Sequence, residues 1–193
     1  DDYSISTQVF GGWKKFFEKE SKRIPFSLVG VKPDKSGLIL IDEQGDENYA
    51  SVYELGFDGK IQGPIFSRDD AEVERILSDI NRKAIGVEYS GFYPSYEFYD
   101  KSLEPILAGI EQYFKGASVY LTDWTDDFSK LLVYAEGVSQ SGAYYLYHRD
   151  KRAIEPLAKS RPDITAEDVA QVLTIEYKAR DGLTIPALLT MPL

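Results

Sequence analysis

The chain has 193 residues, of which 43% are hydrophobic and 28% are charged, as in a soluble globular protein with one good core or two small ones. Its net charge of −10 disfavours binding to nucleic acid and to anionic membrane surfaces, because phosphates would be repelled. The sequence has no cysteine, which excludes disulfides, thiol catalysis and cysteine-ligated zinc. No apolar run approaches the ~18 residues that a membrane-spanning helix needs.

The N-terminal segment VFGGWKKFFEKESKRIPF has two interpretations. Its aromatic residues Trp13, Phe16 and Phe17 fit one face of a helix, and they also fit an aromatic strand. Both interpretations stay open at the level of the sequence.

Three later segments share one pattern. Each has a polar turn with Asp or Asn, then a basic or glycine step, then a strand rich in β-branched residues or leucine. The segments are Val31–Asp42, Leu77–Tyr89 and Thr122–Glu136. Their strands begin near Leu38, Ala84 and Leu131, which lie 46 and 47 residues apart.

An aromatic strand follows each of these segments. The followers are Ala50–Lys60, Tyr93–Ser102 and Gly142–Arg152. Four antiparallel strands repeated every ~40–50 residues are typical of a β-propeller blade, whereas a β-sandwich lacks this longer period. We therefore predict a mostly β fold, a partial β-propeller of three to four four-stranded antiparallel blades.

One amphipathic helix is predicted within this pattern, at Lys101–Gly116. Its apolar residues Leu103, Ile106, Leu107, Ile110 and Phe114 recur at helical spacing. Ser102 is the expected N-cap, and Gly116 is the expected C-terminal stop. We expect the helix to replace the outer strand of a blade and to pack on its own sheet.

The last part of the chain changes character. Asp163–Leu173 has Thr165 and Asp168 at capping-box spacing and predicts a short helical linker. Thr174–Leu193 predicts two strands joined by a turn at Asp181-Gly182, a pair that tolerates positive φ.

A serine triad is not apparent in the sequence. Ser139 lies in GVSQSG, which lacks the glycine two residues after the serine and falls between two predicted strands. His148 is the only histidine, and no matching nucleophile accompanies it. We interpret the first as a loop and the second as a strand-end residue.

The acidic clusters do not predict a site either. Asp42–Asn48 is rich in oxygen ligands but fails the spacing of a calcium loop. The adjacent pairs Asp69-Asp70 and Asp126-Asp127 are interpreted as turns, because neighbouring residues on a strand point to opposite faces. We assign no catalytic, cofactor-binding or metal-binding residue.

The final third resembles a known junction. GAYYLYHRDKRAIEPLAKSRPDI and the following AQVLTIEYKARDGLTIPALLTMPL resemble the passage from β-propeller to α/β-hydrolase domain in the prolyl oligopeptidase family, in its acylaminoacyl-peptidase-like and dipeptidyl-peptidase-like branch. The resemblance covers about the last 50 residues. The matching residues are Tyr144, Tyr145, Leu146, Pro162, Ala179, Arg180, Asp181, Gly182, Ile185, Pro186, Leu189 and Pro192.

The resemblance implies a domain division and a function. Residues 1–162 would be a propeller portion, 163–173 a linker, and 174–193 the first hairpin of a hydrolase domain that lies beyond this chain. The parent would be a serine peptidase whose propeller gates the access of short peptides. The family's catalytic groups would all lie after Leu193, so no catalytic residue is transferred. The implied partners are the downstream hydrolase domain and short peptide substrates.

Two other functions remain open. A stand-alone propeller would serve as a protein-interaction scaffold, since the sequence shows no catalytic group. A carbohydrate-active propeller would use Asp126 and Asp127. An open arc of blades exposes sheet edges, which could pair between copies of the chain.

Overall fold

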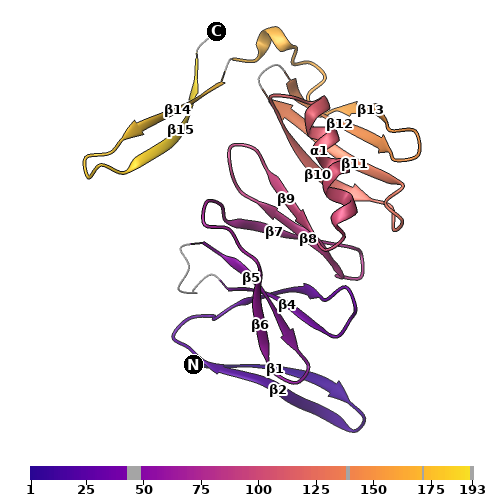
Figure 1. The fold of residues 1–193 in the computed structure, drawn as a ribbon, viewed down its shortest axis with the longest axis vertical. Helices are drawn as coiled ribbons and strands as arrows, with labels where there is room; N and C mark the ends of the chain where they lie inside the picture. Colours follow the sequence, from indigo (N-terminus) through magenta and orange to yellow (C-terminus); the bar gives the residue numbers. More distant parts are fainter. Residues whose placement is uncertain (43–48, 138–139, 171, 192–193) are drawn as a thin grey trace. The chain divides into compact units, whose positions relative to one another are not determined.

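The computed structural model describes residues 1–42, 49–137, 140–170 and 172–191 (Figure 1). Over these residues the chain is mostly β, with one α-helix, and neighbouring strands within each sheet run antiparallel. It divides into two compact units, Asp1–Gly91 with Ser95–Glu104, and Phe92–Pro94 with Pro105–Leu193. The prediction of a mostly β, partial blade-like fold with one inserted helix is confirmed.

The first unit contains one hairpin and two sheets. The hairpin pairs β1 (Asp2–Val9) with β2 (Gly12–Glu20). A four-stranded sheet follows in chain order, with β3 (Ser27–Val31), β4 (Gly37–Asp42), β5 (Ser51–Gly56) and β6 (Ile61–Phe66). The next sheet has three strands, β7 (Val73–Ser78), β8 (Ala84–Tyr89) and β9 (Ser95–Phe98). The N-terminal aromatic segment is thus a strand, which settles the open alternative.

The second unit begins with the helix and contains the other four-stranded sheet. A short 3-10 turn at the end of the first unit (Lys101–Leu103) leads into α1 (Glu104–Tyr113), which follows β9 in the chain at the point where a fourth strand would be expected. The sheet is formed by β10 (Ala117–Trp124), β11 (Lys130–Gly137), β12 (Gln140–His148) and β13 (Ala153–Lys159). A 3-10 turn (Ala166–Asp168) precedes the last hairpin, β14 (Val172–Lys178) with β15 (Thr184–Thr190).

The turns that enter β4, β8 and β11 share one geometry, as the repeated sequence pattern predicts. Each holds one residue in the left-handed region: Lys35 at φ 61°, Arg82 at φ 62° and Phe128 at φ 54°. An aspartate earlier in each turn accepts a hydrogen bond from a backbone N–H, which offsets the cost of this conformation.

The core of the first unit lies between its two larger sheets. Buried side chains from the strands β4 to β8, together with Ala50 just before β5, form one cluster, so the sheets pack face to face. The cluster consists of Ile39, Ile41, Ala50, Val52, Phe66, Val73, Ala84, Val87 and Tyr89. Strand β8 is buried along its whole length, as expected for the middle strand of a covered sheet.

The sheet of the second unit has two different faces. On one face the buried Leu121 lies opposite Val133, which lies opposite Tyr145 in β12. Phe114, just after the helix, contacts Tyr145 with ring centroids 4.6 Å apart, so the C-terminal end of α1 packs on this face. The opposite face carries a row of tyrosines, Tyr120, Tyr134 and Tyr144.

The helical segment is capped two residues earlier than predicted. The side chain of Asp100, and not that of Ser102, caps the first turn by accepting a hydrogen bond from the backbone N–H of Ser102 at 2.9 Å. Gly116 has φ 87° and ends the helical segment as predicted. Among the described residues, none of the helices has the length and apolar character needed to cross a membrane.

Candidate functional site

The hairpin β14–β15 turns at Asp181-Gly182, as the sequence predicts. Ala179 donates its N–H to the carbonyl of Leu183 at 2.8 Å, and Gly182 donates to the carbonyl of Ala179 at 3.0 Å. Gly182 has φ 88°, and an Asp181 carboxylate oxygen accepts the N–H of Leu183 at 3.1 Å. This is a three-residue hairpin loop that ends in a left-handed glycine, a common solution for antiparallel strands.

The two faces of this hairpin differ in character. Residues that lie opposite each other across two strands share a face. One face is apolar at each of three successive cross-strand pairs: Leu173 with Leu189, Ile175 with Ala187, and Tyr177 with Ile185. These six residues are called the hairpin face below. The other face mixes apolar and polar side chains from Val172 with Thr190, Thr174 with Leu188, Glu176 with Pro186, and Lys178 with Thr184.

The hairpin face is largely open to solvent. Tyr177 is 51% exposed, Leu189 is 42% exposed and Ile175 is 37% exposed. In the part of the chain that the structure describes, β14 and β15 pair only with each other. A hairpin of two strands is marginal on its own, and adjoining apolar side chains in solvent mark an interaction surface. The hairpin face is therefore the strongest candidate functional site.

Period-two alternation was the sequence signal for this face. LTIEYK alternates apolar and polar residues, and every second residue of TIPALL is apolar, although Pro186 and Leu188 between them are apolar as well. The two strands and their turn were predicted from the sequence, but the common face of the six apolar residues was not. That common face depends on the register, which the loop length sets.

His148 lies at the end of β12. Its Nε2 atom is 3.1 Å from the Glu155 carboxylate on β13, the neighbouring strand. Among the described residues, no hydroxyl is hydrogen-bonded to the ring. The position agrees with the interpretation of a partly exposed residue at a strand end.

The other residues examined in the sequence fall in turns or outside the described ranges. Ser139 lies outside the described ranges, and so do residues 43–48, which make up most of the acidic segment Asp42–Asn48. Asp69-Asp70 lies in a bend and Asp126-Asp127 in a turn, as predicted. Across the residues that are described, no three acidic or histidine side chains are grouped so that they could hold a metal ion.

Asp127 has a structural role in its turn. It accepts hydrogen bonds from the backbone N–H of Ser129 at 3.0 Å and from the Thr125 hydroxyl at 2.7 Å. These donors, the Ser129 N–H first, lower the pKa of Asp127 to about 2. A carboxylate held ionised in this way does not serve as a general acid near neutral pH.

Comparisons with known proteins do not assign this chain to a family. No protein-family model matches the sequence, and no curated protein matches it significantly.

Proposed function

We propose that this chain is a propeller portion of a prolyl oligopeptidase-family serine peptidase, together with the first hairpin of its α/β-hydrolase domain. The observation that carries the proposal is the hairpin face beside the Arg180-Asp181-Gly182 turn. This turn belongs to the sequence stretch that resembles the family's junction, and the strands around it present an open apolar surface of the kind that a catalytic domain would cover.

The arrangement of the sheets supports the same proposal. β3 to β6 and β10 to β13 each follow chain order, as the strands of a propeller blade do. The proposed role of the blades is steric. A ring of such sheets leaves a narrow route to the catalytic serine, which admits a short unfolded peptide and excludes a folded domain.

The test uses the complete product of the natural gene. We expect it to contain a G-x-S-x-G segment after Leu193, to react covalently with a fluorophosphonate probe, and to cleave short acylated peptides while sparing a folded protein. Replacement of the serine in that segment with alanine is the control and should abolish both labelling and cleavage.

Two results would overturn the proposal. One is a reading frame that ends close to Leu193. The other is a longer product that neither reacts with the probe nor cleaves peptides. The first result would favour the interaction scaffold, and specific partners would then be sought by pull-down.

A further inference from the structure

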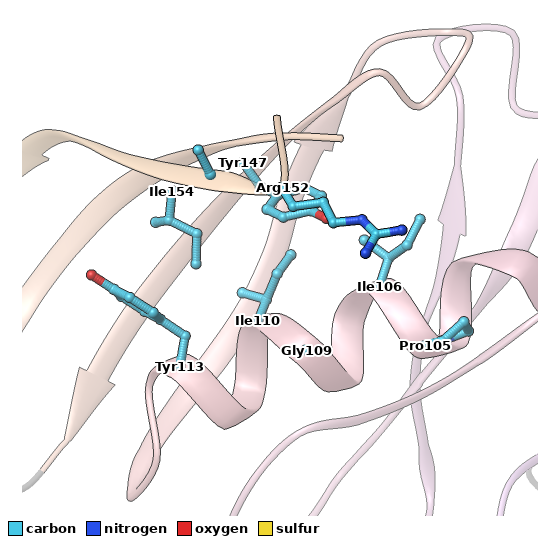
Figure 2. Close-up of a pocket in the computed structure, with 9 residues that line it drawn as sticks. Pro105, Ile106, Gly109, Ile110, Tyr113, Tyr147, Arg152 and Ile154 are labelled. Carbon is cyan, nitrogen blue, oxygen red and sulfur yellow. The ribbon is translucent and has the colours of Figure 1, made fainter. Parts of the chain in front are cut away.

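A cavity of about 670 Å³ lies within the second unit, along helix α1 and beside strands β12 and β13 (Figure 2). This volume is within the range of small-molecule sites. The cavity is lined by Pro105, Ile106, Gly109, Ile110, Tyr113, Tyr147, Arg152, Ala153 and Ile154. It is separate from the hairpin face and does not depend on the peptidase proposal.

Most of the side chains that line the cavity are apolar, and Tyr113, Tyr147 and Arg152 are the exceptions. Ile110, which is 1% exposed, forms part of the floor, and Ile106 and Ile154 belong to the half-buried walls. Figure 2 shows Ile110 and Ile154 turned toward the space between helix and strand. Apolar walls of this kind favour a ligand with an apolar body, because its surface leaves water on binding.

Arg152 is the one charged residue among the nine that line the cavity. Figure 2 shows its side chain extended along the cavity toward Ile106. No carboxylate in the described part of the chain is paired with it. The backbone of Arg152 has φ 48°, so the tight turn between β12 and β13 sets the direction in which its side chain leaves.

We propose that this cavity binds an apolar carboxylic acid, with the ligand carboxylate on the Arg152 guanidinium and the apolar body between α1 and β13. Charge complementarity selects the class. An arginine binds a carboxylate through two parallel hydrogen bonds, whereas a cationic ligand would be repelled and a neutral one would gain no ion pair.

Two sources share this chemistry: a fatty acid and the C-terminal residue of an apolar peptide. The probes are decanoate and acetyl-leucyl-leucine, titrated calorimetrically into the chain at low salt. The first has an apolar body without peptide bonds, and the second carries its carboxylate on a leucine. A ligand of this size should bind with a Kd on the order of 0.1–1 mM. Acetate, which lacks the body, and decylamine, which reverses the charge, should give no saturable binding.

Two variants test the two parts of the site. Arg152→Gln removes the charge and keeps a long side chain at the same backbone position, and it should weaken binding by about tenfold or more. Gly109→Leu places a side chain into the cavity, where a Cβ atom at Gly109 meets nothing within 4 Å. It should weaken binding by a similar factor. Ala108→Leu adds the same side chain at the neighbouring helix position, which does not line the cavity, and should leave the affinity unchanged.

Methyl NMR on the unaltered chain gives a second readout that does not depend on the variants. The methyl signals of Ile106, Ile110 and Ile154 should shift on titration. Binding of decanoate alone would identify a lipid-type acid, binding of the dipeptide alone would identify a peptide C-terminus, and either result supports the site. The proposal is overturned if neither probe binds, if these methyl signals stay unchanged, or if Arg152→Gln binds as tightly as the original chain.

Discussion

Asp127 shows how a single side chain fixes a turn between strands. Its carboxylate accepts hydrogen bonds from the Ser129 N–H and the Thr125 hydroxyl, while the next residue, Phe128, takes a left-handed conformation. The ionised form is favoured in the fold, so the pKa falls from its ordinary 3.8 to about 2. A lowered pKa means that this contribution to stability is fully present above about pH 4 and is lost as the pH falls through about 2.

We predict that carbon-13 NMR will find the Asp127 carboxylate titrating with a midpoint near pH 2. Thr125→Val removes one donor and should move the midpoint upward, toward 3.8. Thr122→Val is the matched control, because the Thr122 hydroxyl donates to the Leu132 carbonyl and not to Asp127. A titration midpoint of Asp127 near 3.8 in the unaltered chain would contradict the hydrogen bonds described for this turn.

The ion pair between Arg75 and Glu88 leads to a second prediction for single residues. Glu88 is only 5% exposed, and one of its carboxylate oxygens accepts from both Nη2 of Arg75 at 2.7 Å and Nε at 2.9 Å. Arg75→Ala leaves a buried carboxylate without this partner and should lower the free energy of unfolding by about 2–3 kcal/mol. Urea denaturation measures the change.

A solvent-exposed pair provides the comparison. Lys60 lies 3.5 Å from Asp58 with both side chains largely in solvent. Lys60→Ala should change the free energy of unfolding by less than about 1 kcal/mol. Equal effects of Arg75→Ala and Lys60→Ala would show that burial of Glu88 is not what makes its partner important.

At the scale of elements, replacement of glycine with alanine should have opposite effects on stability in α1 and in β8. Gly109 lies in α1, and a Cβ atom there meets nothing within 4 Å. Gly109→Ala should stabilise the chain by about 0.5–1 kcal/mol, because alanine is the better helix former. In β8, a Cβ atom on Gly86 would lie 2.3 Å from the Glu97 carbonyl oxygen. Gly86→Ala should therefore destabilise by about 1–3 kcal/mol.

Thermal unfolding of the two variants measures both effects. The Tm should rise for Gly109→Ala and fall for Gly86→Ala. A fall in both would mean that the helix needs its glycine for a reason other than space.

The hairpin β14–β15 leads to a prediction about self-association. Ile175 lies on the hairpin face, and its neighbour Thr174 lies on the opposite face. We expect the unaltered chain to bind the dye ANS and to self-associate in sedimentation experiments, and Ile175→Glu should reduce both, because it breaks the apolar row. Thr174→Glu adds the same charge on the other side and should change neither. Equal effects of the two substitutions would mean that exposed strand edges, and not this face, drive association.

Local patterns predicted the elements well where one chemical signal dominated. The turn aspartates before β4 and β11 and the helical spacing from Leu103 to Phe114 each correspond to the element expected. The segment around Trp13 stayed ambiguous, because three aromatic positions fit both the helix and the strand period. Pairing of β2 with β1 decides it through long-range hydrogen bonds. The N-cap was missed because Asp100 and Ser102 are both good cappers and only the chain path chooses between them.

Sites that depend on distant contacts were less accessible to prediction. The cavity combines the helix around Gly109 with Arg152, some forty residues later in the chain, so no local pattern reveals it. The hairpin face could have been predicted from the sequence, since apolar residues recur at every second position in both strands. Its openness to solvent is a property of packing, and composition does not reveal it.

At the scale of the whole molecule, the proposal joins two observations. The sheets follow chain order in the manner of propeller blades, and the last hairpin presents six apolar residues that the described chain leaves largely open. A propeller followed by a catalytic domain that begins with this hairpin would account for both.

An experimental structure of the complete gene product tests this account most directly. We predict that Ile175, Tyr177 and Leu189 will be buried inside an α/β-hydrolase domain built largely from residues after Leu193, with the sheets of this chain as blades of a propeller. A structure in which the hairpin face packs on the sheet β10–β13 of this same chain, with no hydrolase domain beyond it, would contradict the account.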